Sequence, residues 1–127
     1  MRNSFLLLFL TFAFTSAWGQ GQAKQNCEDP QTQLEMNICA AEDFKRVDAE
    51  LNKVYKEIVS KLEPNSKGLM VKAQKSWLVV RDNHCGLYEQ FYQGGSIMPL
   101  MLYTCKTELT QNRIKELRMI LREVTEE

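Results

Sequence analysis

The sequence predicts an all-α fold, a three-helix antiparallel bundle with long helices that carries two disulfide bonds. Along three segments, apolar residues recur at alternating steps of three and four, which is the spacing of an amphipathic helix. The two breaks between these segments are short and contain proline or glycine. Nowhere is the period-two alternation of a strand sustained. Because short turns between long helices make antiparallel neighbours, the three segments are expected to fold back on one another.

Residues 1–19 are predicted to be a signal peptide. Arg2 supplies the positive n-region, residues 5–14 form the apolar h-region, and residues 17–19 give a small-x-small cleavage site. The apolar run is shorter than the about 20 residues that span a membrane, so we expect cleavage rather than membrane insertion. Residues 20–26 are polar and expected to be a flexible tail, and residues 27–124 are expected to form the helical domain. The expected location is therefore periplasmic or secreted.

The first helix is expected to begin near residue 31. Two start patterns compete there, because Asp29-Pro30 offers a cap followed by proline, whereas Thr32 and Glu35 have the spacing of a capping box. The residues at 63–66, Glu-Pro-Asn-Ser, are expected to end this helix. Its apolar stripe comprises Phe44, Val47, Leu51, Val54, Ile58 and Leu62.

The second helix is predicted to run from residue 66 or 67 to Tyr92, where Gly94-Gly95 follows and stops it. Its inner side is predicted to comprise Leu69, Ala73, Trp77, Val80 or Arg81, Cys85 and Tyr88.

The third helix is expected to be capped by Ser96, with Pro99 in the first turn, where a missing backbone N–H costs nothing. The apolar pattern then continues towards Val124 through Ile97, Met101, Cys105, Leu109, Ile114, Leu117, Ile120 and Leu121.

The predicted disulfide pairing is Cys27–Cys39 and Cys85–Cys105, one of three pairings that four cysteines allow. In two straight antiparallel helices, residues at equal distances from the turn between them lie at the same height, so facing positions are found by reflecting residue numbers through the turn. For a turn centred near residue 95, Cys85 and Cys105 are each about ten residues away and therefore lie level with one another. Reflection through a turn near residue 65 leaves Cys85 about 9 Å along the axis from Cys39, beyond the reach of a disulfide. A metal site is not expected, because no C-x-x-C pair occurs and the single histidine, His84, adjoins Cys85. No cofactor is expected either.

A polar row is predicted on the second helix, where Gln74, Trp77 and Arg81 share a face with Cys85 and Tyr88. The same reflection places Arg81 near Asp48 and Asn52 of the first helix, and Gln74 near Tyr55. We expect Asp48 and Arg81 to form a partly buried pair, because a buried guanidinium requires a partner. The predicted structural polar network is Asp48, Asn52, Tyr55, Gln74, Trp77 and Arg81. The functional alternative, that Asp48, Arg81 and Tyr55 form a ligand pocket or a catalytic acid–base group, stays open.

An ordered series of motifs runs through residues 27–121, and it resembles the domain family named after the N-terminal region of the LprI lysozyme inhibitor. The motifs are Cys27, Thr32-Gln33-x-Glu35-Met36-Asn37-x-Cys39, Asp48-x-x-Leu51-Asn52-x-x-Tyr55, Gln74-x-x-Trp77-x-x-x-Arg81-Asp82-x-x-Cys85, Gly94-Gly95-Ser96 and Cys105. The resemblance implies a small, all-helical, secreted or periplasmic domain with lysozyme inhibition as its activity. Because no cysteine directly follows the cleavage site, a soluble protein is implied rather than a lipid-anchored one.

The function expected from this resemblance is that of an extracytoplasmic protein-binding domain that occludes the cleft of a glycoside hydrolase. The candidate partner-binding residues lie in the second turn and are Tyr88, Tyr92, Gly94, Gly95 and Ser96. The alternative for this segment is that Tyr88, Phe91 and Tyr92 complete the core, while Gly94-Gly95 permits a tight turn. The alternative function is that of a periplasmic adaptor or an immunity protein against an unrelated target.

Charge and motif content bear on the other function classes. The 16 basic and 16 acidic side chains balance, so neither nucleic acid nor an anionic membrane is favoured as a partner. The same balance predicts no attraction to a basic partner. No catalytic residues are predicted, because Ser-His-Asp spacing, paired glycosidase carboxylates in a recognisable context and a phosphate loop are all missing from the sequence.

Overall fold

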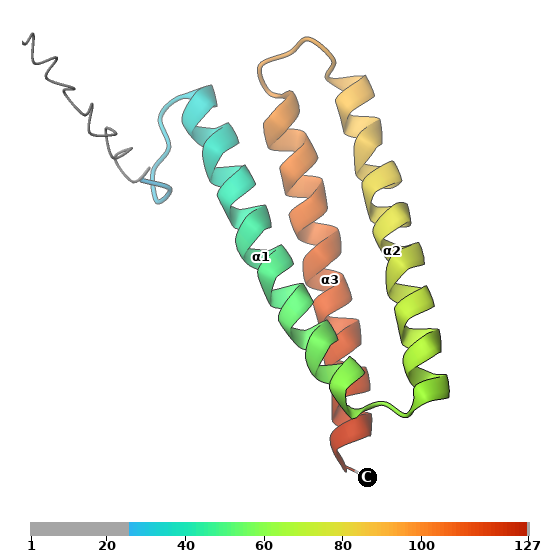
Figure 1. Ribbon diagram of the computed structural model, residues 1–127. Helices are drawn as coiled ribbons and strands as arrows, with labels where there is room; N and C mark the ends of the chain where they lie inside the picture. Colours follow the sequence, from blue (N-terminus) through green and yellow to red (C-terminus); the bar gives the residue numbers. More distant parts are fainter. Residues whose placement is uncertain (1–25, 127) are drawn as a thin grey trace, which may run out of the picture.

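The computed structural model describes residues 26–126, which form three helices: α1 (Gln33–Lys61), α2 (Pro64–Phe91) and α3 (Met98–Glu126). Figure 1 shows α1 and α3 running in the same direction and α2 running in the opposite one, with α3 between the other two in this view. The predicted three-helix antiparallel bundle is confirmed. The predicted signal peptide and residues 20–25 of the predicted tail lie outside the described residues.

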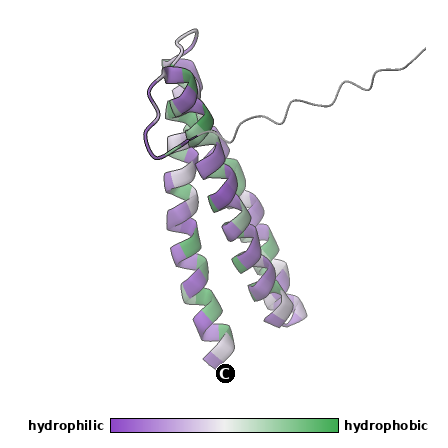
Figure 2. Ribbon diagram, turned by 90° about the vertical axis from the view of Figure 1, so that its left-hand side faces the viewer, coloured by the Kyte–Doolittle hydropathy of each residue, from purple (hydrophilic) through white to green (hydrophobic). Residues whose placement is uncertain are grey.

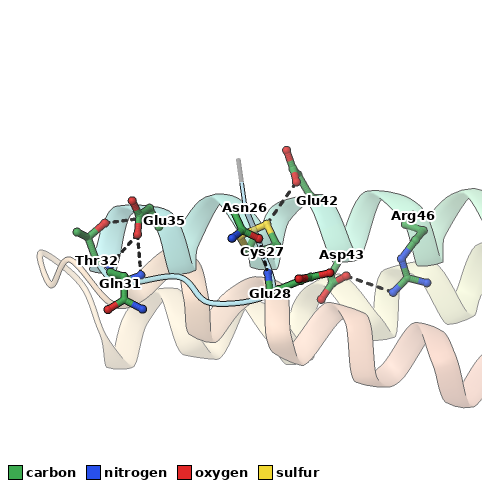
Figure 3. Close-up of a disulfide and its surroundings, with 10 residues drawn as sticks. Asn26, Cys27, Glu28, Gln31, Thr32, Glu35, Glu42, Asp43 and Arg46 are labelled. Carbon is green, nitrogen blue, oxygen red and sulfur yellow. Dashed lines mark hydrogen bonds and ion pairs between the residues drawn. A yellow bond between two sulfur atoms is a disulfide. The ribbon is translucent and has the colours of Figure 1, made fainter. Parts of the chain in front are cut away.

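The capping box at Thr32 begins α1. The Glu35 backbone N–H donates to Thr32 Oγ1 over 3.2 Å, and the Thr32 backbone N–H donates to Glu35 Oε2 over 3.0 Å (Figure 3). Two of the N–H groups at the helix start are thereby satisfied by side chains. Of the two competing start patterns, the capping box is therefore the one used, and Asp29-Pro30 lies in the preceding loop.

The second helix begins earlier than the sequence predicted. Pro64 is its first residue and the carbonyl of Glu63 accepts from the Lys67 N–H over 2.8 Å, so the predicted start at residue 66 or 67 is wrong. The physical reason is that proline suits the first helical position, where its missing N–H has no helical acceptor. The segment predicted to end α1 thus belongs largely to α2, and α1 itself ends at Lys61.

The third helix begins one residue later than predicted. The Ile97 carbonyl accepts from the Met101 N–H over 3.2 Å, so Ile97 occupies the cap position and the predicted cap at Ser96 is wrong by one residue. Pro99 does lie in the first turn, as expected. The preceding turn requires Gly94, whose φ of +78° belongs to the left-handed region.

The larger apolar core joins all three helices. It comprises the buried residues Val47, Leu51, Val54, Ile58, Met70, Ile114 and Leu117. Four of these come from α1 and two from α3, which pack closely on each other, whereas α2 packs mainly on α3 and contributes Met70. Figure 2 shows the result as apolar and polar positions alternating along every helix. None of the described helices has a stretch long and apolar enough to span a membrane.

The inner side predicted for the first half of α2 is wrong by one residue. Leu69 is 70% exposed and Ala73 is exposed, whereas Met70 and Gln74 are buried. The helix turns about 100° per residue, so a shift of one residue moves the buried stripe to a neighbouring face. The buried stripe follows the predicted polar row, which includes Gln74, rather than the apolar residues Leu69 and Ala73.

Both predicted disulfides are confirmed. Cys27 pairs with Cys39, with 5.5 Å between their Cα atoms, and Cys85 pairs with Cys105 across 5.7 Å. The first ties the loop before α1 onto that helix, and the second joins α2 to α3 within a smaller apolar cluster that also contains Leu102. Each disulfide removes freedom from the unfolded chain, worth about 3 kcal/mol in the chain-entropy model.

The two glycines Gly94 and Gly68 provide a matched test of the turn. We predict that Gly94→Ala destabilises the fold by about 1–2 kcal/mol, because its φ is positive. Gly68→Ala should instead stabilise the fold by about 0.5–1 kcal/mol, because this glycine is helical and a Cβ there meets no atom within 4 Å. Urea unfolding measures both free energies, and a neutral Gly94→Ala would contradict the turn geometry.

Candidate functional site

The Arg81 guanidinium is the centre of a buried polar network. Arg81 is 7% exposed, and its Nη1 donates to Asp48 Oδ1 on α1 over 2.9 Å, so the predicted contact between these residues is present. Its Nε donates to Asp82 Oδ1 over 3.0 Å, and Nη1 also lies 3.4 Å from Thr110 Oγ1 on α3. One side chain of α2 therefore contacts both other helices.

The Asp48 carboxylate is held by Asn52, another member of the predicted polar network. Asn52 Nδ2 donates to the Asp48 backbone carbonyl over 2.8 Å and to Asp48 Oδ2 over 3.2 Å. The two carboxylate oxygens thus have separate donors, Arg81 for Oδ1 and Asn52 for Oδ2. Hydrogen bonds to both oxygens fix the carboxylate in the orientation that Arg81 needs.

Aromatic rings supply a further part of the guanidinium's surroundings. The Arg81 Cζ lies 5.2 Å from the centre of the Phe44 ring and 5.3 Å from the Trp77 ring. Both distances are within the range of a cation–π contact, which offsets part of the cost of removing the charge from water. Phe44 also has Lys106 Nζ within 5.8 Å.

The network continues down α2 to Gln74. This side chain is 6% exposed, and its Oε1 accepts from Arg113 Nε over 3.2 Å. The Arg113 guanidinium also lies 5.8 Å from the Trp77 ring, so Trp77 has two guanidinium groups nearby. Tyr55, the remaining predicted member, packs instead against the larger apolar cluster. The structure thus gathers five of the six predicted residues around Arg81 and Arg113, and leaves Tyr55 in the core.

Sequence reasoning missed several members of this network, namely Phe44, Asp82, Lys106, Thr110 and Arg113. Asp82 directly follows Arg81, and because adjacent residues of a helix do not face each other, their spacing gave no reason to pair them. Thr110 is fully buried on α3, but the apolar pattern around it gave no reason to place a hydroxyl in the core.

The candidate partner-binding residues lie away from this network, at the end of the bundle where the loop after α2 meets the start of α1. Asn37 Nδ2 donates to the Ser96 carbonyl over 2.9 Å, and Gln33 Nε2 donates to Asn37 Oδ1 over 2.9 Å. Two side chains of α1 thereby hold the loop. We call this part of the molecule, residues 88–98 together with residues 33–38, the loop end.

The aromatic residues at the loop end form a row. The Tyr88 and Tyr92 rings are parallel with centroids 6.5 Å apart, and the Phe91 ring meets Tyr88 edge-on at 6.1 Å. Tyr88 packs against the cluster around Cys85, and Tyr92 is half-buried. Phe91, however, is 70% exposed, so the alternative in which all three aromatic residues complete the core is wrong for Phe91.

A shallow groove of about 510 Å³ opens beside the loop. Its lining residues are Gln33, Leu34, Asn37, Gly94, Gly95, Ser96, Met98 and Pro99. Leu34 is 68% exposed at its rim. A Cβ at Gly95 would lie 3.2 Å from the Tyr92 carbonyl, so the loop is tight at this point. The groove combines exposed apolar surface with backbone polar groups, as binding surfaces commonly do.

The segment that contacts the loop through Asn37, residues 26–44, is acidic, and we call it the acidic surround. Residues 26–44 contain no lysine or arginine and five carboxylates, Glu28, Asp29, Glu35, Glu42 and Asp43, most of them drawn in Figure 3. The Glu42 carboxylate approaches the Cys27 sulfur to 3.6 Å, a contact rather than a hydrogen bond because a disulfide sulfur carries no proton. The opposite end is basic, since residues 53–75 contain six lysines and two glutamates.

The balanced net charge therefore hides a segregation along the bundle axis. The prediction of no attraction to a basic partner used only the balanced total, whereas the start of α1 is acidic and the α1–α2 hairpin is basic. A field of this kind orients an approaching charged partner even when the total charge is zero. No group of three His, Cys, Asp or Glu side chains among the described residues is placed to hold a metal ion.

Comparison with known proteins identifies relatives over most of the chain. Residues 23–117 match the profile of the family described as "Lysozyme inhibitor LprI". A protein of Rhizobium meliloti (strain 1021), "Uncharacterized protein R02472", is 31% identical over 134 residues, which cover 95% of this chain and 96% of the relative. No solved structure matches the chain significantly.

Two aspartates of α1 test whether the Arg81 network stabilises the fold. We predict that Asp48→Ala lowers the free energy of unfolding by about 2 kcal/mol, because it leaves a buried guanidinium without its 2.9 Å acceptor. Asp43→Ala is the matched control, and it should change the value by less than about 0.5 kcal/mol, because the Asp43–Arg46 pair is mostly exposed. Urea unfolding at neutral pH measures both variants. Equal effects would show that burial of Arg81 does not depend on Asp48.

Proposed function

The chain belongs to the lysozyme inhibitor LprI family, and on this premise we propose that it is an extracytoplasmic domain that binds a lysozyme and occludes its substrate cleft. The proposed location is the periplasm or the extracellular space. Two disulfides support this location, because they form and persist in oxidising compartments.

The observation that carries the proposal is an uncharged loop with an acidic surround. Residues 90–105 contain no charged side chain, and the acidic segment of residues 26–44 contacts them through the Asn37–Ser96 hydrogen bond. Many lysozymes are basic, so an acidic surround attracts them and raises the rate of association. Complementary charge thus supports a lysozyme as partner, in a way that the net charge alone did not.

The uncharged loop suits the cleft itself. A glycosidase of this kind has two catalytic carboxylates in its cleft, and an occluding protein must cover or hydrogen-bond them without adding another negative charge. The loop end offers the hydroxyl groups of Tyr92 and Ser96 and the exposed ring of Phe91. Donors and an aromatic anchor at the centre, with charge at the periphery, match the usual anatomy of a protein interface.

A variant of the loop tests the proposed site. We predict that Tyr92→Ala combined with Ser96→Ala raises the inhibition constant in a muramidase assay at least tenfold, corresponding to about 1.4 kcal/mol or more of lost binding free energy. The matched control combines Met119→Ala with Ser60→Ala, two exposed residues near the opposite end of the bundle, and it should inhibit like the parent.

The assay needs a panel of c-, g- and i-type lysozymes, because the family relationship does not specify the type. Unchanged inhibition by the loop variant would remove the loop from the site. A parent protein that inhibits none of the panel would favour the alternative function, a periplasmic adaptor or an immunity protein, and capture from a periplasmic extract would then identify its target.

Neutralising the acidic surround tests the electrostatic part of the proposal separately. We predict that Glu28→Gln, Glu42→Gln and Asp43→Asn together slow association with a basic lysozyme about tenfold or more at low salt, with a smaller effect on dissociation. The control, Glu63→Gln, Glu123→Gln and Glu126→Gln, makes the same change in net charge away from the loop end. Surface plasmon resonance at two salt concentrations measures both rates. Equal slowing by the two triple variants would show that only net charge matters.

A further inference from the structure

A groove with an apolar floor and a basic rim lies at the α1–α2 hairpin, where the end of α1 meets the start of α2. Its volume is about 690 Å³. Figure 1 shows this hairpin at the opposite end of the bundle from the loop between α2 and α3. We call it the hairpin groove. Its lining residues are Leu62, Pro64, Gly68 and Val71, together with Lys67, Lys72 and Lys75.

The packing of α2 explains why the hairpin groove stays open. Helix α2 packs mainly on α3 and much less on α1, so α1 and α2 leave a space between them near the hairpin. Leu62 and Val71 are half-buried there, whereas Pro64 and Gly68 are exposed. Apolar atoms therefore form the floor of the groove, and they remain accessible to another molecule.

The three lysines of the hairpin groove share one side of α2. Lys67 and Lys75 are eight residues apart with Val71 midway between them, and Lys72 directly follows Val71. All three lysines are exposed, and no carboxylate of the described residues forms an ion pair with any of them. A lysine stem is apolar, so it can lie along the floor while its ammonium group reaches a charged ligand. The groove thus offers three unpaired cations around an apolar surface.

The surroundings of the hairpin groove are basic as well. Residues 53–75 carry six lysines and two glutamates. Residues 118–126 of α3 reach the same end of the bundle (Figure 1) and add two arginines and two glutamates, with Glu127 next in the sequence. The acidic surround contacts the loop at the opposite end. The balanced total charge, which gave no reason to expect an anionic membrane as a partner, therefore does not describe this end of the molecule.

The combination of an apolar floor and unpaired lysines indicates the chemistry of the ligand. A small anion would pair with the ammonium groups but leave the floor in contact with water. An acidic protein segment would match the charge, but its carboxylates would not cover apolar surface. Anionic phospholipids present both parts together, phosphate at the surface and hydrocarbon directly beneath it. Peripheral membrane proteins bind through this pairing of apolar burial and electrostatic attraction.

We propose that the hairpin groove docks on the surface of a bilayer that contains anionic phospholipid. The three ammonium groups contact phosphates, and Leu62, Pro64 and Val71 contact the acyl boundary beneath them. The negative potential of the bilayer attracts the hairpin and repels the acidic surround, so it also orients the bundle. The loop end then points away from the bilayer, where a lysozyme can reach it. The proposal uses the proposed extracytoplasmic location and does not depend on lysozyme inhibition.

Two triple variants test the basic rim. Lys67→Gln, Lys72→Gln and Lys75→Gln together should weaken binding to vesicles of phosphatidylglycerol and phosphatidylcholine at least about tenfold, because each lysine near an anionic surface contributes about fivefold. The matched control is Lys53→Gln, Lys56→Gln and Lys61→Gln, which makes the same change in net charge outside the groove and should weaken binding less than about threefold. Flotation of the disulfide-bonded protein with vesicles, at two salt concentrations, measures both variants.

Two valines of α2 test the apolar floor. Val71→Ser should weaken vesicle binding about threefold or more, because it removes apolar surface that the acyl boundary covers. Val80→Ser is the control and should bind like the parent, since Val80 is 62% exposed and lies nine positions later, on the opposite side of the helix. Urea unfolding shows whether both variants are folded.

Several outcomes would overturn the proposal. They are a parent that does not bind the mixed vesicles, a parent that binds vesicles of phosphatidylcholine alone equally well, equal weakening by the two lysine variants, and equal effects of the two valine variants. Parent binding to polyglutamate but not to vesicles would indicate an acidic protein as the ligand instead.

The muramidase assay keeps this proposal separate from the proposed function. The groove variant of Lys67, Lys72 and Lys75 should inhibit like the parent, because the hairpin groove and the loop end lie at opposite ends of the bundle. A parent that binds vesicles and inhibits no lysozyme would contradict the proposed function alone.

Discussion

The burial of one guanidinium constrains the rest of this structure. Arg81 is 7% exposed, and a charge so placed is stable only when its donors are paired and the acceptors are held still. Asp48 on α1, Asp82 on α2 and Thr110 on α3 supply these acceptors, so the relative heights of all three helices are coupled at this level. The larger apolar cluster lies on one side of the network along the bundle and the Cys85–Cys105 cluster on the other. Arg81 thus separates two apolar cores and fixes how they align.

Local chemistry explains what could be predicted from the sequence. The apolar repeat of α1, the capping box at Thr32 and the disulfide pairing all depend on residues whose spacing along straight helices determines their place. The reflection that places Arg81 beside Asp48 succeeds for the same reason. The start of α2 differs from expectation because Pro64 both ends one helix and begins the next within two residues. Its inner face was misplaced because Gln74, a polar residue, is buried while Leu69 and Ala73 are exposed.

The loop end shows why function was harder to predict than fold. The candidate loop residues were found as an aromatic and glycine-rich turn, but their acidic surround comes from the start of α1, more than fifty residues earlier in the chain. Only the fold brings these two segments together, through Asn37 and Ser96. Net charge, a sum over the chain, cancels the acidic loop end against the basic hairpin and so hides the property that bears on a partner.

The proposed function gives the two parts of the molecule different roles: the middle, around Arg81, would maintain the shape, and the loop end would contact the lysozyme. Amide hydrogen exchange of the disulfide-bonded protein, with and without an excess of a lysozyme that it inhibits, tests this division most directly. The account predicts that the lysozyme slows exchange in residues 88–98 and 33–38 and leaves residues 44–52 and 77–82 unchanged. Protection centred on the residues around Arg81, with the loop end unaffected, would contradict it.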